Sequence, residues 1–337
     1  MAVQRGSGGG ASATAELSAA GRAAPVVTPA PDPATSSTEG VDPTTAPSPA
    51  TTAPSPTTAA PVPTAAPPDP YRGAGTWVDA FDFNPPHAPK GVPTVTPAQV
   101  DAMADVGVRT LYLQAARPND PLAPGDLLDP ELLGQFLVRA HARGMLVVAW
   151  YLPHLDDVAN DQRHLQAIAD FRSQGQRFDS IALDIEWRSG VSDHCERSRR
   201  LVALSQWLRG ITAGQRLAAV VMPPVVTDVL NLDFWPCYPW GEMTPLYDVW
   251  MPMVYWTNRA PGTPWRDAYT YTAENLRLLR EHVPGAVVHP IGGIGDQASA
   301  EDYAGFLRAA GEFSSIGTSI YDWYTQAADT WPLLTGR

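Results

Sequence analysis

FDSIALDIEWR, residues 178–188, reads as a buried strand, Ser180 to Ile185, that ends in two carboxylates. Because strand residues alternate between faces, Ala182, Asp184 and Glu186 share one face. Two acids at the end of an apolar strand are costly to bury and repel one another, so we expect one raised pKa and one ionised carboxylate. Acid–base cleavage of a glycosidic bond requires one carboxyl group in each of these states.

The rest of the chain from residue 71 repeats this pattern of strand and helix. Eight apolar, strand-like runs are predicted at Thr76–Phe83, Thr110–Ala115, Leu146–Leu152, Ser180–Glu186, Leu217–Met222, Asp248–Tyr255, Ala286–Ile291 and Ile316–Trp323. Helical patterns are clear at Pro97–Val106, Pro130–Ala142, Asp161–Gln174, Cys195–Ile211, Tyr269–His282 and Ala300–Ala310. Eight alternations predict one α/β domain, a (β/α)8 TIM barrel. An open doubly wound sheet is the alternative, but no glycine-rich phosphate turn follows the first run.

Residues 1–70 differ sharply in composition from residues 71–337. They are mostly Ala, Pro, Thr, Ser and Gly, and both cysteines and all the tryptophans lie beyond them. Such a segment cannot bury enough apolar surface to offset its ordering entropy. We therefore predict a disordered, low-complexity linker or stalk over 1–70 and the barrel over 71–337.

Charge and hydropathy exclude some partners and locations. The net charge of −12 argues against nucleic acid, and no run of about 18 apolar residues predicts a membrane span. Met1–Ala24 contains no apolar signal-peptide core, yet a Pro/Thr stalk before a compact domain favours an extracellular or cell-wall location. We expect a monomer.

Cys195 and Cys237, the two cysteines, fall in segments predicted to follow the fourth and fifth strands on the same face of the barrel. A disulfide between them would stiffen two loops at the barrel mouth and fits an oxidising compartment. Two separate reduced thiols are the alternative.

In a TIM barrel the chemistry sits at the carboxyl ends of the strands. Those ends carry, in order, Asp79, Asp82, Asn84, Gln114, Arg117, Trp150, Tyr151, His154, Asp184, Glu186, Trp187, Met222, Pro223, Met253, Tyr255, Trp256, His289, Tyr321, Asp322 and Trp323. Aromatic planes around carboxylates suit sugars, whose C–H faces stack while their hydroxyls take polar partners. The candidate substrate-binding residues are Asp79, Asp82, Gln114, Tyr151, Trp187, Met253, Tyr255, Trp256, Tyr321 and Trp323. Since Asp79 and Asp82 are an odd number apart, one strand would turn only one of them inward, and the other would cap a turn or helix.

Other chemistries have weaker signals. His154 and His289 lack metal-ligand spacing, so we name no metal ligand and no cofactor. No G-x-S-x-G elbow supports a serine nucleophile. IGGIG, residues 291–295, is interpreted as a tight turn at the mouth rather than a phosphate site.

The strand-4 motif resembles that of the glycoside hydrolase barrels, notably chitinase-like family 18 and lysozyme-like family 25, in an actinobacterial-type branch. Family 18 has D-G-x-D-x-D-x-E at this strand. Asp179, Asp184 and Glu186 match its first Asp, last Asp and Glu, whereas Ser180 and Ala182 replace its Gly and middle Asp. Met253 and Tyr255 look like the family's strand-6 Met-x-Tyr. Family 25 instead pairs its D-x-E with a strand-1 Asp, which Asp79 or Asp82 could supply.

The resemblance implies a retaining glycosidase of N-acetylhexosamine polymers such as peptidoglycan or chitin. Glu186 would be the general acid, and Asp184 would orient an N-acetyl group that acts as internal nucleophile. Tyr255 would hydrogen-bond that group, and Trp323 would stack under the ring. Two alternatives stay open: a catalytically silent barrel that binds cell-wall glycan, and a barrel enzyme of another reaction type.

Overall fold

The computed structural model describes residues 68–336. Its eight strands are all parallel and form one sheet in the order β6-β5-β4-β3-β2-β1-β8-β7. The strands are β1 (Gly73–Val78), β2 (Thr110–Gln114), β3 (Leu146–Tyr151), β4 (Ser180–Ile185), β5 (Leu217–Val221), β6 (Val249–Pro252), β7 (Ile291–Ile294) and β8 (Gly317–Tyr321). The α-helices are α1 (Ala80–Phe83), α2 (Val100–Asp105), α3 (Pro130–Ala142), α4 (Val158–Asp170), α5 (His194–Ile211), α6 (Trp240–Met243), α7 (Ala268–His282), α8 (Ala300–Glu312) and α9 (Trp331–Thr335).

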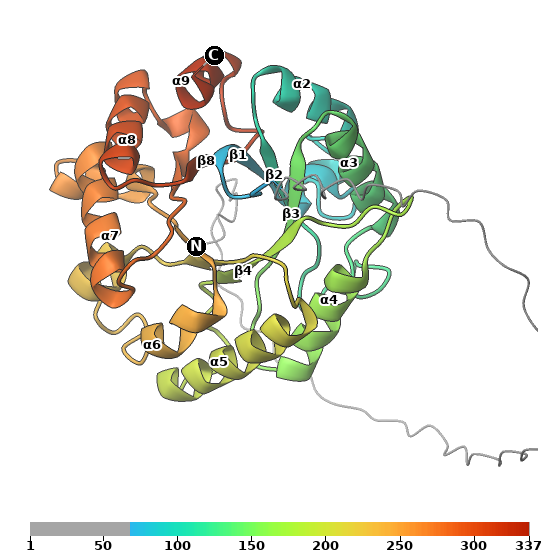
Figure 1. The fold of residues 1–337 in the computed structure, drawn as a ribbon, viewed down its shortest axis with the longest axis horizontal. Helices are drawn as coiled ribbons and strands as arrows, with labels where there is room; N and C mark the ends of the chain where they lie inside the picture. Colours follow the sequence, from blue (N-terminus) through green and yellow to red (C-terminus); the bar gives the residue numbers. More distant parts are fainter. Residues whose placement is uncertain (1–67, 337) are drawn as a thin grey trace, which may run out of the picture. The chain divides into compact units, whose positions relative to one another are not determined.

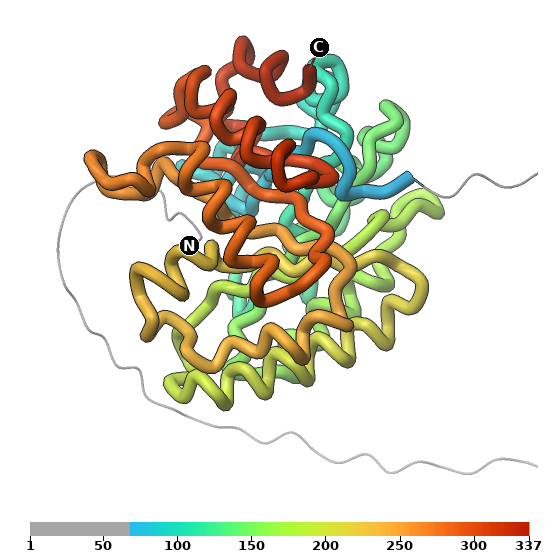
Figure 2. The backbone as a smooth tube through the Cα atoms, turned by 60° about the vertical axis from the view of Figure 1, so that its left-hand side comes forward, coloured from blue at the N-terminus to red at the C-terminus, as the bar shows by residue number. Residues whose placement is uncertain are grey.

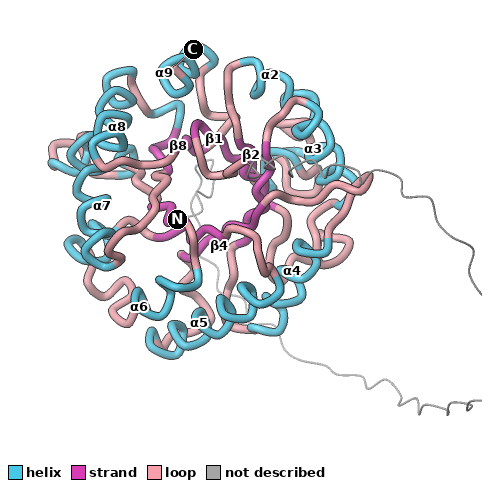
Figure 3. Tube along the Cα trace, in the orientation of Figure 1, coloured by secondary structure: helices cyan, strands magenta, loops and turns pink. Residues whose placement is uncertain are grey.

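The sheet curls into a nearly closed barrel inside a ring of helices (Figures 1 and 3). Single bridges from Trp250 to Val288 and from Met253 to Ile291 join the last pair of strands, β6 and β7. The final helix, α9, packs against β1, so the first and last elements of the described chain lie side by side (Figure 2). The predicted (β/α)8 barrel is confirmed.

Two apolar layers hold the barrel together. The outer layer packs strand residues such as Ile181, Leu183 and Ile185 against the helices. The inner layer fills the barrel and includes Trp77 and Tyr112, whose rings stack with centroids 4.4 Å apart. Burying aromatic rings below the mouth gives the functional end of the barrel a rigid floor.

The predicted bounds of the first strand are wrong. The strand ends at Val78, and Asp79 then caps α1 by accepting hydrogen bonds from the amides of Phe81 (2.8 Å) and Asp82 (3.2 Å). An Asp that accepts two amide hydrogen bonds stabilises a helix start, and that ends the strand before Phe83. The prediction that only one of Asp79 and Asp82 points inward assumed that both lie on one strand. They do not share a strand, so that prediction does not apply.

The seventh strand also begins later than predicted. Val288 makes only an isolated bridge, and β7 is formed by Ile291–Ile294, so IGGIG is not a turn. A Cβ on Gly292 would come within 2.5 Å of Ile320, and one on Gly293 within 2.8 Å of Thr257. The two glycines thus permit close packing against neighbouring segments.

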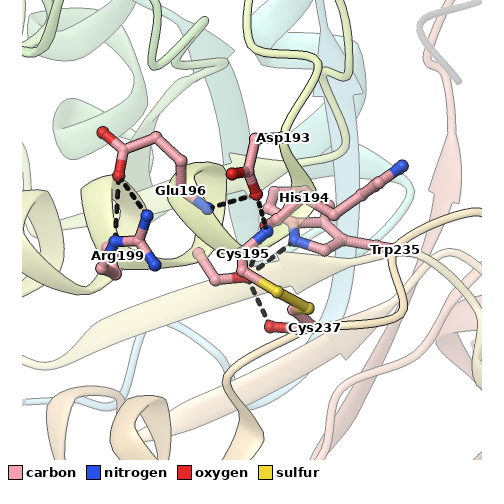
Figure 4. The surroundings of a disulfide bond; sticks show 8 residues. Asp193, His194, Cys195, Glu196, Arg199, Trp235 and Cys237 are labelled. Carbon is pink, nitrogen blue, oxygen red and sulfur yellow. Dashed lines mark hydrogen bonds and ion pairs between the residues drawn. A yellow bond between two sulfur atoms is a disulfide. The ribbon is translucent and has the colours of Figure 1, made fainter.

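The predicted disulfide between Cys195 and Cys237 is present, although Cys195 lies in the first turn of α5 rather than in a loop (Figure 4). It fastens the segment after β5 to the start of the helix that follows β4. Ser198 reinforces this attachment, because its hydroxyl donates to the carbonyl of Cys237 (2.5 Å) and accepts from Trp235 Nε1 (2.9 Å).

The predicted segment 1–70 lies outside the described residues except for its last three positions. Asp69 and Pro70 belong to the barrel: Asp69 pairs with Arg216, and the carbonyl of Pro70 accepts a hydrogen bond from Thr110 (2.7 Å). Within residues 68–336, no helix is both long and apolar enough to cross a membrane.

Candidate active site

Asp184 lies at the carboxyl end of β4, two residues after Ala182 of the inner layer, so the alternation of the strand puts both residues on one face. Glu186 directly follows the strand, and its position on that face stays a prediction. Asp184 is 7% exposed and Glu186 8% exposed. Asp179 lies at the opposite end of β4, where its Oδ2 contacts His141 Nε2 (2.9 Å) and accepts from the amide of Val147 (2.7 Å). Only the second half of the motif therefore faces the mouth.

Burial raises the pKa of Asp184 to about 7. Its Oδ1 is buried and has no hydrogen-bond partner within residues 68–336, so nothing there compensates the loss of water around the charged form. The sequence predicts a raised pKa from burial and from repulsion between the two acids, and burial is the main cause. The Asp184 carboxyl group can hold or release a proton near neutral pH.

Tyr255 faces this carboxyl group from the end of β6. It is in the inner layer and 7% exposed. Burial, followed by the charges of Asp184 and Asp322, raises the pKa of Tyr255 well above its usual value. The hydroxyl therefore stays protonated and can donate a hydrogen bond inside the mouth. Met253, two residues earlier, is also in the inner layer.

A second acidic group gathers where β1 and β8 end. Carboxylate oxygens of Asp79, Asp82 and Asp322 lie within 4.8 Å of one another, and all three residues are buried. The Tyr321 hydroxyl donates to Asp79 Oδ2 (2.5 Å), and its ring centroid lies 6.0 Å from that of Tyr255. Tyr321 thus connects this group to the side of the mouth that holds Asp184.

Three oxygen ligands at this spacing could contact one cation. Each acid, however, already accepts a hydrogen bond: Asp79 from Tyr321, Asp82 from Thr94 (3.3 Å), and Asp322 from the amide of Thr325 (2.8 Å). We assign no metal ligand. Asp322 was not among the candidate site residues, although its place directly after Tyr321 was the available signal.

Gln114 and Trp187 complete the predicted residues that the structure brings to the mouth. Gln114 is buried at the end of β2 and accepts a hydrogen bond from the amide of Ala80 (2.8 Å), which fixes the start of α1. Trp187 is partly exposed, packs against the inner layer and stacks on His154 with ring centroids 4.1 Å apart. This stack offers a flat surface at the rim.

Three predicted residues lie on the outer side of the barrel instead. Tyr151, Trp256 and Trp323 all belong to or pack against the layer between strands and helices. Tyr151 donates to Asp161 (2.7 Å), and Trp323 stacks on Trp331 with centroids 5.1 Å apart. Strand β8 ends at Tyr321, so the alternation that placed Trp323 on the inner face stops before it reaches Trp323.

A cavity of about 310 Å³ lies at the other end of the barrel, among the starts of β1 and β8 and the ends of α8 and α9. It contains none of the predicted site residues. Its lining includes Arg109 and Ser315. The convergence of acids and aromatic residues, rather than this cavity, marks the candidate active site.

Solved structures of glycan-cleaving barrels share this architecture. The spore cortex-lytic enzyme SleL of Bacillus megaterium QM B1551 aligns over 80% of this chain and 75% of its own, with a TM-score of 0.56 at 12% identity. A class V chitinase from Pseudomonas fluorescens Pf-5 aligns over 78% of this chain and 98% of its own, with a TM-score of 0.56 at 10% identity.

A family 18 chitinase from Cycas revoluta gives a TM-score of 0.55 at 12% identity, over 78% of this chain and 98% of its own. The chain has the fold of these glycoside hydrolases. No protein-family model and no curated protein matches its sequence. The similarity to these enzymes therefore lies in the barrel fold alone.

Proposed function

We propose that this protein is a retaining glycosidase that cleaves an N-acetylhexosamine-containing glycan of a cell wall, in an extracellular or wall-associated location. One observation carries the proposal: Asp184, with a pKa of about 7, and Glu186, two residues later, are both buried at the carboxyl end of β4. Two carboxyl groups facing one reacting centre match the requirement for acid–base cleavage. The spore cortex-lytic enzyme SleL and the class V chitinase share this fold, which supports this choice of substrate.

In the proposed reaction Glu186 donates its proton to the leaving glycosidic oxygen as the C1–O bond breaks. The carbonyl oxygen of the substrate's own N-acetyl group forms a bond to C1, and water later displaces it with Glu186 as the base. Asp184, in the ionised form that it takes above its pKa of about 7, accepts the N–H of that acetamido group and stabilises the positive charge that develops on it. Tyr255 donates a hydrogen bond to the acetamido group, as its protonated hydroxyl permits.

Varying the leaving group tests the role of Glu186. We expect Glu186→Gln to lower kcat/KM, which reports the step that breaks the glycosidic bond, by about 10²–10⁴ on N-acetylglucosaminides whose leaving group needs a proton. The loss should be much smaller on 4-nitrophenyl glycosides, because that leaving group departs without protonation. Glu281→Gln, at a well-exposed position on α7, is the matched control and should keep full activity. An equal loss on both kinds of substrate would contradict the assignment of Glu186 as the acid.

A glycan-binding barrel without hydrolysis is the second candidate, and one observation favours it. Ala182, buried directly below Asp184 on the inner face, replaces an acid of the family 18 motif. Such a protein would bind glycan equally well with Glu186 or Gln at position 186 and would release no product.

A further inference from the structure

Aromatic and arginine side chains follow one half of the barrel mouth, from helix α1 directly after β1 to the loop after β5. All are partly or fully exposed. We call them the aromatic–arginine rim: Phe81, Arg117, His154, Trp187, Arg188 and Phe234.

The first half of the rim runs from Phe81 to Trp187. The Arg117 guanidinium lies over the Phe81 ring, 4.7 Å from its centroid. Burial lowers the pKa of the nearby His154 imidazole, and the charge of Arg117 adds to this effect against the opposing charge of Asp156. The neutral His154 ring stacks on Trp187 at an interplanar angle of 10°. Arg117 therefore lies near the flat pair of rings formed by His154 and Trp187.

The second half runs from Trp187 to Phe234. Arg188 places its guanidinium over the Phe234 ring, 4.2 Å from the centroid, and Nη1 donates to the Phe234 carbonyl (3.4 Å). Phe234 lies three residues before Cys237, in the segment that the disulfide fastens to α5 (Figure 4). The position of the second arginine is therefore supported by a covalent cross-link.

Both arginines keep charge available for a ligand. Arg188 is exposed, and the Arg117 side chain is 32% exposed. Arg117 reaches Asp120 only through Nε at 3.9 Å, and Asp120 has a closer partner in His87 (2.7 Å). A guanidinium stacked on an aromatic ring still presents N–H groups in its plane, and two of them match a carboxylate.

The rim passes directly beside the candidate catalytic acids, because Trp187 and Arg188 are the two residues after Glu186. The acids are buried at the centre of the mouth, whereas the arginines lie at its edge. A sugar ring seated on the Trp187 plane could place its glycosidic bond near Glu186 and a substituent near either arginine. A neutral polysaccharide offers the two guanidinium groups only uncharged oxygen acceptors, whereas a carboxylate adds the opposite charge and a bidentate geometry.

We propose that the aromatic–arginine rim binds a glycan with carboxylate substituents, so the substrate of this site is an acidic glycan rather than a neutral one. This inference rests on the proposed function for the position of the cleaved bond. The affinity of the rim for the carboxylate can nevertheless be measured without catalysis.

The test uses the full chain with Glu186→Gln, which prevents turnover under the proposed mechanism. The probes are a peptide-free oligosaccharide of alternating N-acetylglucosamine and N-acetylmuramic acid, and its methyl ester, which has the same skeleton without the charge. Calorimetry should give a dissociation constant about five-fold lower for the acid, as expected for a pair of partly exposed charges. In about 1 M salt, where the Debye length is about 3 Å, the difference should shrink.

Adding Arg117→Gln and Arg188→Gln should remove the preference, so that the acid and the ester bind with equal affinity. Arg277→Gln, on the distant helix α7, is the matched control and should keep the preference. Equal affinity of the unaltered rim for acid and ester, or binding of neither, would overturn the proposal. Because no hydrolysis enters the measurement, an arginine-dependent preference without any glycosidase activity would refute the proposed function alone.

Discussion

Asp184 holds its proton because its carboxyl group is buried and lacks a compensating hydrogen bond in the described part of the chain. The folded protein therefore binds this proton more tightly than the unfolded chain, in which the pKa is near 3.8. As the pH rises from about 4 to 7, the unfolded chain releases the proton while the folded protein keeps it. Asp184 thus lowers the free energy of unfolding across this window, by at most about 4 kcal/mol.

Replacing Asp184 with Asn should remove that dependence. We expect the free energy of unfolding of Asp184→Asn, relative to the parent protein, to increase between pH 4 and pH 7 and to level off above pH 7. Urea denaturation at a series of pH values measures this. Asp170→Asn, on the exposed face of α4, is the control and should run parallel to the parent. A parallel profile for Asp184→Asn would show that the Asp184 carboxyl group is not buried as described.

At the scale of the elements, the disulfide joins helix α5 covalently to the segment after β5. Closing 42 residues of chain between Cys195 and Cys237 restricts the unfolded state, which stabilises the fold by about 2–4 kcal/mol. We expect the double variant Cys195→Ser, Cys237→Ser to lose this amount in urea denaturation. Reductant should lower the midpoint of the parent protein and leave that of the double variant unchanged. A parent midpoint insensitive to complete reduction would contradict the prediction.

The sequence predicts the inward side of a strand where polar residues occupy one of its two faces. Strand β4 begins at the predicted Ser180 and ends at Ile185, and the acids at 184 and 186 predict which of its sides faces inward. Strands of a parallel barrel are buried on both faces, so an apolar run alone does not tell which side faces inward. Tyr151 and Trp256 were therefore assigned to the mouth but lie in the outer layer. The predicted first strand runs through Asp79 to Phe83, whereas Asp79 caps helix α1, so the sequence does not predict this helix.

Contacts between loops were beyond prediction. Sequence reasoning placed Arg117, His154 and Trp187 at strand ends, but no periodicity says that rings on different loops will stack. The contacts of His154 with Trp187 and of Arg188 with Phe234 depend on loop paths. Those paths are set by distant interactions such as the disulfide.

At the scale of the whole molecule, the barrel begins earlier than the change in composition suggests. Asp69 and Pro70 bond to Arg216 and Thr110, which lie on or next to the barrel strands. We expect a chain of residues 68–337 to match the thermal stability of the full protein. A chain of residues 71–337 should be less stable by about 1–2 kcal/mol, because it loses an ion pair and a hydrogen bond. Equal stability of the two shortened chains in urea denaturation would place the barrel's start at residue 71.

The full chain also provides the most direct test of the proposed activity. The parent protein, Glu186→Gln and the control Glu281→Gln should be incubated with peptidoglycan, chitin oligosaccharides and a panel of other polysaccharides, and released saccharides identified by mass spectrometry. We predict new reducing ends from an N-acetylhexosamine glycan with the parent and the control, and none with Glu186→Gln. Product from none of the three proteins, or equal product from all, would contradict a glycosidase that depends on Glu186.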